Sequence, residues 1–338
     1  MFASKLTRRA AVSASAGLAL ALSLSACGGN VSDSGAAADG SEFPSGPVTL
    51  TIGQDPGGST DRIGRALAEN AADPLGVAIP VVNKPGANGA LATKEVAGME
   101  PDGQNLILLN ASLITITPLA VSEEEAVSLD DVEVITGISQ DDYVLVTAPS
   151  SGFTTVEDLA NAGRPITFGT TGVGTGSQLS QELLFNQAGI DATAVPFDGG
   201  SPTLTAVLGS QVDVGSIQLG EAIEQIEAGE LTPIVTFAEE RVSYLPDTPT
   251  AVEAGYDVPV QQSRAVFAPK GTPEDVIDTL QASFQTAFQS EAYQQFNQDN
   301  QLTANEVDGE EVRQTWTSNL DRYRSVVEQY SIDLGGEQ

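Results

Sequence analysis

Residues 48–61 of this 338-residue chain read VTLTIGQDPGGSTD, and this stretch indicates how the chain folds. Apolar and polar residues alternate over residues 48–52, which predicts a strand. A loop rich in glycine and hydroxyl residues follows, and Ile63, Ala66 and Leu67 then recur at helical spacing. A strand, a loop and a helix in this order form the repeating unit of an α/β fold, in which helices cover both faces of a parallel sheet.

The same order of elements recurs almost to the end of the chain. Thr154 and Glu157 have the spacing of a helix capping box, and Ser201 precedes a proline at the first position of an expected helix. After residue 268 we expect helices without new strands. The expected strands cover 79–82, 106–109, 143–147, 166–168, 192–195, 212–217, 234–237 and 258–268, and the expected helices cover 90–98, 154–163, 179–188, a segment from 201, and most of 272–332.

The pattern restarts after residues 143–147, so we expect two α/β units of similar size. Because the C-terminal helices bring no new strands, they are expected to pack on the first sheet. The chain then crosses between the units twice, near residues 146 and 260, and two crossings make a hinge with a cleft. We therefore expect domain 1 at 43–146 and 262–338, and domain 2 at 147–261.

The N-terminus has the features of an export signal. Lys5, Arg8 and Arg9 precede an apolar stretch over residues 10–24, which is too short for a comfortable membrane-spanning helix. The arginine pair also permits export by the twin-arginine route, and the sequence leaves this choice open.

Cys27 is the only cysteine in the chain, and it ends the run LSAC at residues 24–27. This run resembles the lipobox of bacterial lipoproteins, in which the cysteine is acylated and becomes the first residue of the mature chain. We therefore expect a signal peptide at 1–26, a lipid on Cys27, and a flexible tether of small residues at 27–42. A lone buried cysteine is the alternative interpretation. The expected location is the outer face of the cell membrane.

The mature chain is strongly acidic. The whole chain has a net charge of −32, and without the three basic residues of the signal it holds 11 Lys and Arg against 46 Asp and Glu, a net charge of −35. Such a surface repels nucleic acid and anionic lipid headgroups, so we expect no nucleic-acid partner. The acidic surface fits a protein that stays soluble in concentrated salt and equally an exported protein of an acidic proteome.

Histidine is absent from the chain. Its absence removes the commonest general base and the commonest metal ligand, and with only an acylated cysteine present it excludes Ser-His, Cys-His and Cys/His metal sites. Catalysis by carboxylates alone, or metal binding by oxygen ligands, is what remains. We expect no enzymatic activity, no cofactor and no metal.

Three loops of glycine and hydroxyl residues each lie between an expected strand and an expected helix, at 56–61, 170–177 and 198–202. In the first loop, Ser59 or Thr60 is expected to cap the helix, and the N–H groups of the first turn form a cradle for a carboxylate. This loop lacks the lysine of a Walker loop and the spacing of a dinucleotide fingerprint. One such loop is more simply a tight turn, but three at the carboxyl ends of strands favour a small-molecule site.

Short motifs with a fixed order and spacing accompany these loops. They are FPS at 43–45, VNKPGANG at 82–89, PDG at 101–103, VPF at 195–197, LGSQV at 208–212, AG at 228–229, LPDTPT at 245–250, EAG at 253–255 and APKGTP at 268–273. Together with residues 48–61 they closely resemble the substrate-binding proteins of tripartite tricarboxylate transporters, the TctC or Bug family. The resemblance extends from about residue 43 to 334.

The resemblance implies a type II periplasmic-binding-protein fold, in which two α/β domains joined by two crossover strands close on a ligand in the cleft. It also implies that a small organic acid is bound and delivered to the subunits of a membrane permease. We expect the receptor to be a monomer. In the family, main-chain amides, hydroxyls and waters hold a carboxylate, and these roles carry over to Gly58, Ser59, Thr60, Gly174, Thr175 and Ser177, with Asn110, Ala111 and Ser112 lining the cleft.

The chain departs from the family pattern at two places that bear on the ligand. Gln178 stands where many members have histidine, and Ile217-Gln218 stand where many have Asp-Asn. Arg264 lies on an expected hinge strand, where it either contacts a second carboxylate through its forked guanidinium or forms an interdomain ion pair. The remaining candidate ligand-binding residues are Gly57, Asp61, Thr171, Gly176, Gln178, Gly199, Gly200, Ser201, Gln218 and Arg264.

Two other functions are compatible with the sequence. A sensor subunit would present the bound ligand to the outer domain of a membrane histidine kinase. An extracytoplasmic enzyme would use paired carboxylates, for which Asp61 and Asp198 on the candidate loops are the candidates.

Overall fold

The computed structural model describes residues 43–335 of the chain. These residues together form one compact body. None of the helices in this range combines the length and the apolar character that crossing a bilayer requires. The expected signal peptide, the tether and Cys27 lie outside the described residues.

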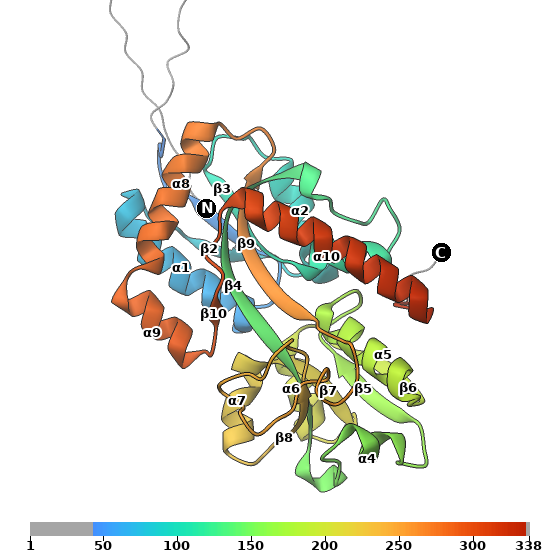
Figure 1. Ribbon diagram of the computed structural model, residues 1–338. Helices are drawn as coiled ribbons and strands as arrows, with labels where there is room; N and C mark the ends of the chain where they lie inside the picture. The colour runs from blue at the N-terminus through green and yellow to red at the C-terminus, as the bar shows by residue number, and fades with distance from the viewer. Residues whose placement is uncertain (1–42, 336–338) are drawn as a thin grey trace, which may run out of the picture. The chain divides into compact units, whose positions relative to one another are not determined.

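A mixed sheet of ten strands runs through the described residues (Figure 1). The strands are β1 (Thr49–Ile52), β2 (Val81–Asn83), β3 (Asn105–Asn110), β4 (Val132–Thr147), β5 (Ile166–Thr170), β6 (Ala192–Pro196), β7 (Val214–Gln218), β8 (Thr232–Thr236), β9 (Gln261–Pro269) and β10 (Thr303–Ala304). Their order is β2-β1-β3-β9-β4-β7-β5-β6, and β8 and β10 each pair with β4. The short strand β10 lies where we expected only helices.

The two ends of the sheet are parallel and its middle is antiparallel. β1 pairs in parallel with β2 and β3, and β5 pairs in parallel with β6 and β7. β4 and β9 run antiparallel to each of their neighbours. The expectation of a parallel sheet is therefore wrong in the middle, because β4 leads from the first half of the sheet to the second and β9 leads back.

Helices cover both faces of the sheet in each half. They are α1 (Ser59–Leu75), α2 (Ala90–Ala97), α3 (Ser112–Thr115), α4 (Val156–Ala160), α5 (Gly176–Ala188), α6 (Gly200–Leu208), α7 (Leu219–Glu227), α8 (Glu274–Phe288), α9 (Glu291–Asp299) and α10 (Gly309–Tyr330). In Figure 1, α1, α2, α8, α9 and α10 surround the first half, which contains β1 to β3, and α4 to α7 surround the second half, which contains β5 to β7. The C-terminal helices thus return to the first half, as expected.

β3 is buried on both faces, which explains its continuous apolar sequence. Leu106 and Leu108 share a hydrophobic cluster with residues of α1 and α8, whereas Ile107 and Leu109 share one with residues of α2 and α10. All four side chains are at most 2% exposed. Since alternate residues of a strand point to opposite faces, helices on both faces require an uninterrupted apolar run. The prediction of a buried strand at 106–109 is confirmed.

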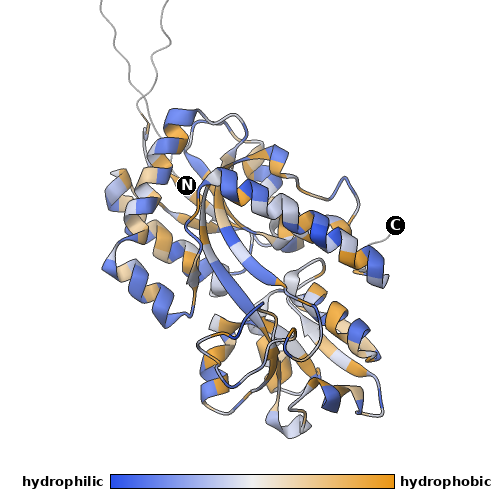
Figure 2. Ribbon diagram, viewed as in Figure 1, coloured by the Kyte–Doolittle hydropathy of each residue, from blue (hydrophilic) through white to orange (hydrophobic). Residues whose placement is uncertain are grey.

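The second half is built in the same way around the end of β4. Tyr143 and Leu145 share a hydrophobic cluster with β5 and α5, whereas Val144 and Val146 share one with α6 and α7. Figure 2 shows apolar residues gathered on these strands and on the inner faces of the helices, with hydrophilic residues on the outer faces. Each half therefore has its own core on both sides of the sheet.

β4 and β9 connect the two halves. β4 pairs with β9 over residues 132–142 and with β7 over residues 143–147, so the first crossing comes slightly before the expected position near residue 146. The second crossing enters β9 at Gln261, next to the expected position near residue 260. The paired segments 139–142 (SQDD) and 261–264 (QQSR) are hydrophilic (Figure 2). Polar residues are therefore concentrated where the chain passes between the halves.

Two helices next to the candidate loops begin at glycine residues. The N-cap of α1 is Gly58, and Ser59 and Thr60 are its first two helical residues. The N-cap of α6 is Gly199, with a φ of 106° that favours glycine, and Ser201 lies inside the helix. Neither helix has a side-chain cap. The expected hydroxyl caps are therefore wrong, and the first N–H groups of both helices need acceptors from elsewhere.

The capping box of α4 lies one residue later than expected. Thr155 Oγ1 accepts from the Asp158 N–H at 3.1 Å, and the Asp158 carboxylate accepts from the Thr155 N–H at 2.9 Å. The prediction of a capping box between Thr154 and Glu157 is therefore wrong. The pair one residue later is favoured because the Asp158 carboxylate also accepts from the N–H and the hydroxyl of Thr154.

Candidate functional site

A cavity of about 880 Å³ brings the three candidate loops together. Residues that follow β1, β5 and β6 line it, in segments 53–60, 171–175 and 197–202, and Gln218 joins them from the end of β7. All of these residues lie at the carboxyl ends of strands, which is where α/β folds place their ligands. The loops therefore face a shared gap.

The candidate residues fall into two groups around this cavity. Those that line it are Gly58, Ser59, Thr60, Asn110, Thr171, Thr175, Gly199, Gly200, Ser201 and Gln218. Those that lie outside its lining are Gly57, Asp61, Ala111, Ser112, Gly174, Gly176, Ser177, Gln178 and Arg264. Several members of the second group hydrogen-bond to the loops from behind, so they shape the cavity without facing it.

The N-terminus of α1 presents main-chain N–H groups beside the cavity. The first hydrogen bond of this helix runs from the Arg62 N–H to the Gly58 carbonyl oxygen at 3.0 Å. The N–H groups of residues 59–61 therefore have no acceptor within the helix. The Ser59 N–H donates to Glu221 Oε1 at 2.8 Å. These N–H groups, at the positive end of the helix dipole, favour an anionic group.

Asp61 holds the first loop in shape. Its carboxylate accepts from the Gly57 N–H and from Asn83, each at 2.9 Å, and pairs with Arg65 at 2.9 Å. Burial acts to raise the pKa of Asp61, but the hydrogen bonds from Arg65, Gly57 and Asn83 outweigh it and hold that pKa below its ordinary value. Asp61 does not line the cavity with Asp198. The carboxylate pair considered for an enzyme is therefore not formed at the cavity.

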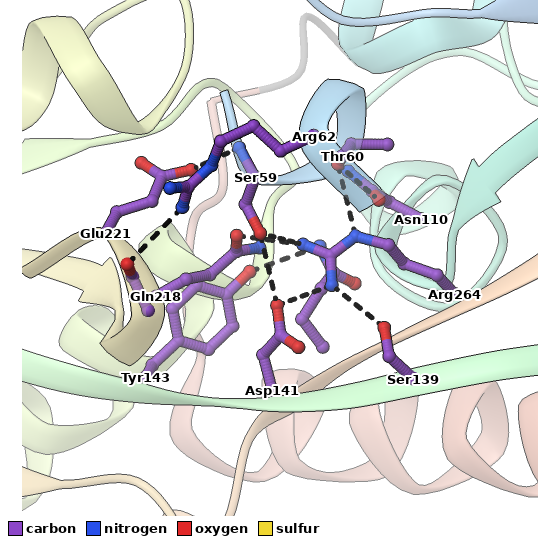
Figure 3. Close-up of polar contacts among 12 residues, drawn as sticks. Ser59, Thr60, Arg62, Asn110, Ser139, Asp141, Tyr143, Gln218, Glu221 and Arg264 are labelled. Atoms are coloured by element: carbon purple, nitrogen blue, oxygen red, sulfur yellow. Dashed lines mark hydrogen bonds and ion pairs between the residues drawn. The ribbon is translucent and has the colours of Figure 1, made fainter. Parts of the chain in front are cut away.

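Arg264 of β9 is fully buried and forms an ion pair with Asp141 of the adjacent strand β4 (Figure 3). A guanidinium group has five N–H donors, and each has an acceptor here. Nε donates to Thr60 Oγ1 (3.2 Å), Nη1 to Ser139 Oγ (3.4 Å) and Asp141 Oδ2, and Nη2 to Ser59 Oγ (3.1 Å) and Gln218 Oε1 (2.8 Å). The guanidinium thus joins the first loop to Gln218 in the second half of the sheet. Arg264 forms an ion pair, as in the second alternative, but both charged partners lie within expected domain 1, so the pair itself is not interdomain.

The hydroxyl groups of the first loop are engaged inside the protein. Ser59 Oγ donates to Asp141 Oδ2 at 3.5 Å, and Thr60 Oγ1 donates to Asn110 Oδ1 at 3.0 Å. Both hydroxyl oxygens also accept from Arg264 (Figure 3). The donors that this loop leaves for a ligand are therefore main-chain N–H groups.

The second loop is held from behind by its own side chains. Thr175 caps α5, because its Oγ1 accepts from the Gln178 N–H at 3.3 Å. Ser177 Oγ donates to the Ser216 carbonyl oxygen at 2.6 Å, and Gln178 Oε1 accepts from the Gly174 N–H at 2.9 Å. Ser177 and Gln178 are buried under the loop. They fix its shape, and Thr175 faces the cavity.

The polar residues that line the cavity include several that were not among the sequence candidates, such as Asn88, Thr117 and Gln262. Asn88 Nδ2 donates to Thr117 Oγ1 at 3.0 Å, and Thr117 Oγ1 donates to the carbonyl oxygen of Gly174 at 2.9 Å. Gln262 Nε2 donates to the Tyr143 hydroxyl at 3.2 Å. Asn88 lies in the VNKPGANG motif, which was the available signal for it. Thr117 and Gln262 carry no comparable signal.

Glu221 near the start of α7 is a further lining residue outside the sequence candidates. It follows β7, so the strand-end rule that selected the loops also points to it. Its Oε1 accepts from Ser59, as Figure 3 shows, while Oε2 is shielded from solvent and has no partner among the described residues. Burial raises the pKa of the Glu221 carboxyl, although the Ser59 N–H and the charges of Arg264 and Arg62 oppose the shift.

Comparison with known proteins identifies the family. The family model described as the tripartite tricarboxylate transporter family receptor, TctC, matches residues 63–332. The chain belongs to the TctC family. This TctC receptor is 30% identical to protein BugT of Bordetella pertussis over 260 residues, which cover 74% of the chain and 78% of BugT. The predicted family is therefore confirmed.

Solved structures of similar proteins share the fold of this TctC receptor. The periplasmic binding protein BugD is 26% identical with a TM-score of 0.80, and the match covers 87% of this chain and 100% of BugD. MatC from Rhodopseudomonas palustris, solved with bound malate, is 27% identical with a TM-score of 0.78, and the match covers 84% of this chain and 100% of MatC. The predicted periplasmic-binding-protein fold is confirmed. The family comprises extracytoplasmic solute receptors, so enzymatic activity is not expected of this TctC receptor.

Proposed function

We propose that this TctC receptor captures a small organic acid with one to three carboxylates and delivers it to the membrane permease of a tripartite tricarboxylate-type transporter. The observation that carries the proposal is the N-terminus of α1, whose N–H groups lie beside a cavity lined from both halves of the sheet. Such N–H groups stabilise a carboxylate without a charged side chain. The malate bound to MatC supports an acid ligand for this chain.

The ligand is bound mainly through hydrogen bonds from main-chain N–H groups. Lys94 is the one lysine or arginine among the described residues that line the cavity, and its Nζ donates to the carbonyl oxygen of Glu124 at 2.6 Å. Arg264 is committed to Asp141 and to four other acceptors. Neither cation has the free geometry of a carboxylate clamp, so the loops supply the recognition.

The receptor works by hinge closure. Domain 1 (43–146 and 262–338) and domain 2 (147–261) move about the crossing segments of β4 and β9, and the ligand bridges the loops of both. Ligand binding favours the closed form only if the ligand makes contacts there that the open form lacks. An acid that touches the first loop alone would bind without closing the receptor.

Binding of an organic acid tests this function directly. The protein from residue 27 onward is expected to bind at least one mono-, di- or tricarboxylate with a dissociation constant in the micromolar range, about −8 kcal/mol. A thermal-shift screen of organic acids, aromatic acids and amino acids, followed by calorimetry on the hits, checks this expectation. If no acid shifts the melting temperature, the transport proposal loses its basis.

The receptor is held at the outer face of the cell membrane by a lipid on Cys27. This proposal rests on the LSAC run and on the export signal before it. A single acyl chain anchors weakly and two chains anchor stably, so we expect the full-length receptor to sediment with membranes. Cys27→Ala should move it to the soluble fraction, as measured by fractionation with and without detergent. Acyl-dependent membrane attachment that survives the substitution would contradict the anchor.

A further inference from the structure

The charged residues that line the cavity of this receptor are mainly acidic. Asp55, Glu125, Asp198 and Glu221 line it, against the single cation Lys94. Asp55, Glu125 and Asp198 are exposed, so water and salt screen their charges. The charge of Glu221 is less screened, because its carboxylate lies between the start of α1 and the start of α6.

Glu221 occupies space that a side chain on Gly200 would need. A β-carbon built on Gly200 would collide with Glu221 Oε2, and Gly200 itself lines the cavity. Oε1 is bound to the Ser59 N–H, whereas Oε2 has no partner among the described residues and is shielded from solvent. A buried carboxylate with one unpaired oxygen is costly, and burial accordingly raises the pKa of Glu221. A cation of the ligand beside this carboxylate would offset the cost.

The positive side chains near Glu221 do not neutralise it. Arg264 forms its ion pair with Asp141, so together these two groups carry no net charge. Arg62 is exposed, and its Nη2 donates to the carbonyl oxygen of Gly220 at 3.4 Å. The electrostatic field that reaches the cavity from this end is therefore negative, and it acts most strongly at short range from the Glu221 carboxylate.

We propose that Glu221 makes this receptor selective for organic acids that also carry a protonated amino group. One carboxylate of such a ligand accepts from the N–H groups of residues 60–61, and its ammonium group pairs with Glu221. An unsubstituted dicarboxylate would bring a second negative charge towards Glu221 without any compensation. This inference rests on the proposed function, since it names the class of acid that the same cavity selects.

Matched pairs of acids test the inference. Calorimetry should compare succinate with aspartate and glutarate with glutamate, because the members of each pair differ by one amino group. Wild-type receptor is expected to bind the aminated member at least tenfold more tightly, about 1.4 kcal/mol. Glu221→Gln keeps an oxygen for the Ser59 N–H but removes the charge, so the ratio of the two affinities should fall at least tenfold. Glu224→Gln removes an exposed charge from the same helix and should leave the ratio unchanged.

The outcomes separate this inference from the proposed function. If both members of a pair bind and Glu221→Gln leaves their ratio as in wild type, Glu221 does not select the ligand although the receptor still binds acids. If the wild type binds the unsubstituted acids more tightly than the aminated ones, the inference that Glu221 favours an amino group is wrong. If no acid of the wider screen binds the wild type, the proposed function fails, and the inference about Glu221 fails with it. Urea unfolding of each variant confirms that the ratios compare folded proteins.

Discussion

Replacing Arg264 with methionine is expected to lower the free energy of unfolding by about 3–5 kcal/mol, because it leaves a buried carboxylate without its partner. Arg264 is 0% exposed and Asp141 is 3% exposed. The substitution also removes the donors that hold Ser59, Thr60 and Gln218 in place. Urea unfolding at pH 7 measures the loss.

The exposed ion pair of Arg241 and Glu253 provides the matched control. Its atoms approach to 2.9 Å, yet the two side chains are 45% and 42% exposed. Exposed ion pairs contribute little to stability, so Arg241→Met should lower the free energy of unfolding by at most about 1 kcal/mol. An equal loss for Arg264→Met and Arg241→Met would contradict the role assigned to burial.

The double variant Arg264→Met with Asp141→Leu separates the pair from its surroundings. Each single substitution leaves one buried charge without its opposite charge, whereas the double substitution removes both charges together. Its loss of stability should therefore be clearly smaller than the sum of the two single losses, by more than ~1 kcal/mol. Strict additivity would mean that Arg264 and Asp141 do not stabilise the fold as a pair.

This ion pair illustrates what the sequence could not predict. Asp141 and Arg264 are 123 positions apart, and of the two only Arg264 lies in a segment that was expected to be a strand. The strand was expected to begin at residue 143, and the stretch from 132 to 142 was missed. Its buried apolar residues Val132, Ile135 and Ile138 do not follow a regular two-residue alternation, because the strand is irregular after Val134 and after Gly137. Buried polar pairs such as Asp141 and Arg264 leave no periodic signal either, so β4 was recognised only over residues 143–147.

The position of the loops was more predictable than the direction of their side chains. Strand-end placement brought the loops at 56–60 and 198–202 to one cavity, because each follows the carboxyl end of a strand and the two halves of the sheet aim these ends at a shared gap. Ser177 and Gln178 belong to the second loop but are buried beneath it, since their partners are main-chain groups of that loop and of β7. Which residues of a glycine-rich loop face the ligand depends on φ and ψ angles that composition does not specify.

Replacing Gly220 with alanine is expected to weaken ligand binding at least tenfold, about 1.4 kcal/mol, with little loss of stability. Gly220 lies in the first turn of α7, where alanine suits a helix at least as well as glycine. A β-carbon there would collide with the carbonyl oxygen of Asn300 at the end of α9. α7 belongs to the second half and α9 to the first, so the added methyl group should hold the halves apart.

Calorimetry with whichever acid the screen identifies, together with thermal unfolding, measures the two effects of Gly220→Ala separately. Gly98→Ala is the control, because a β-carbon there meets its nearest neighbours at 3.6 Å, which is ordinary contact. The methyl group on Gly220 sits beside Glu221, so opening the halves would also break the hydrogen bond from the Ser59 N–H. Loss of affinity without loss of stability therefore points to the closed arrangement as the binding form. Unchanged affinity would mean that the receptor binds its ligand without bringing α7 against α9.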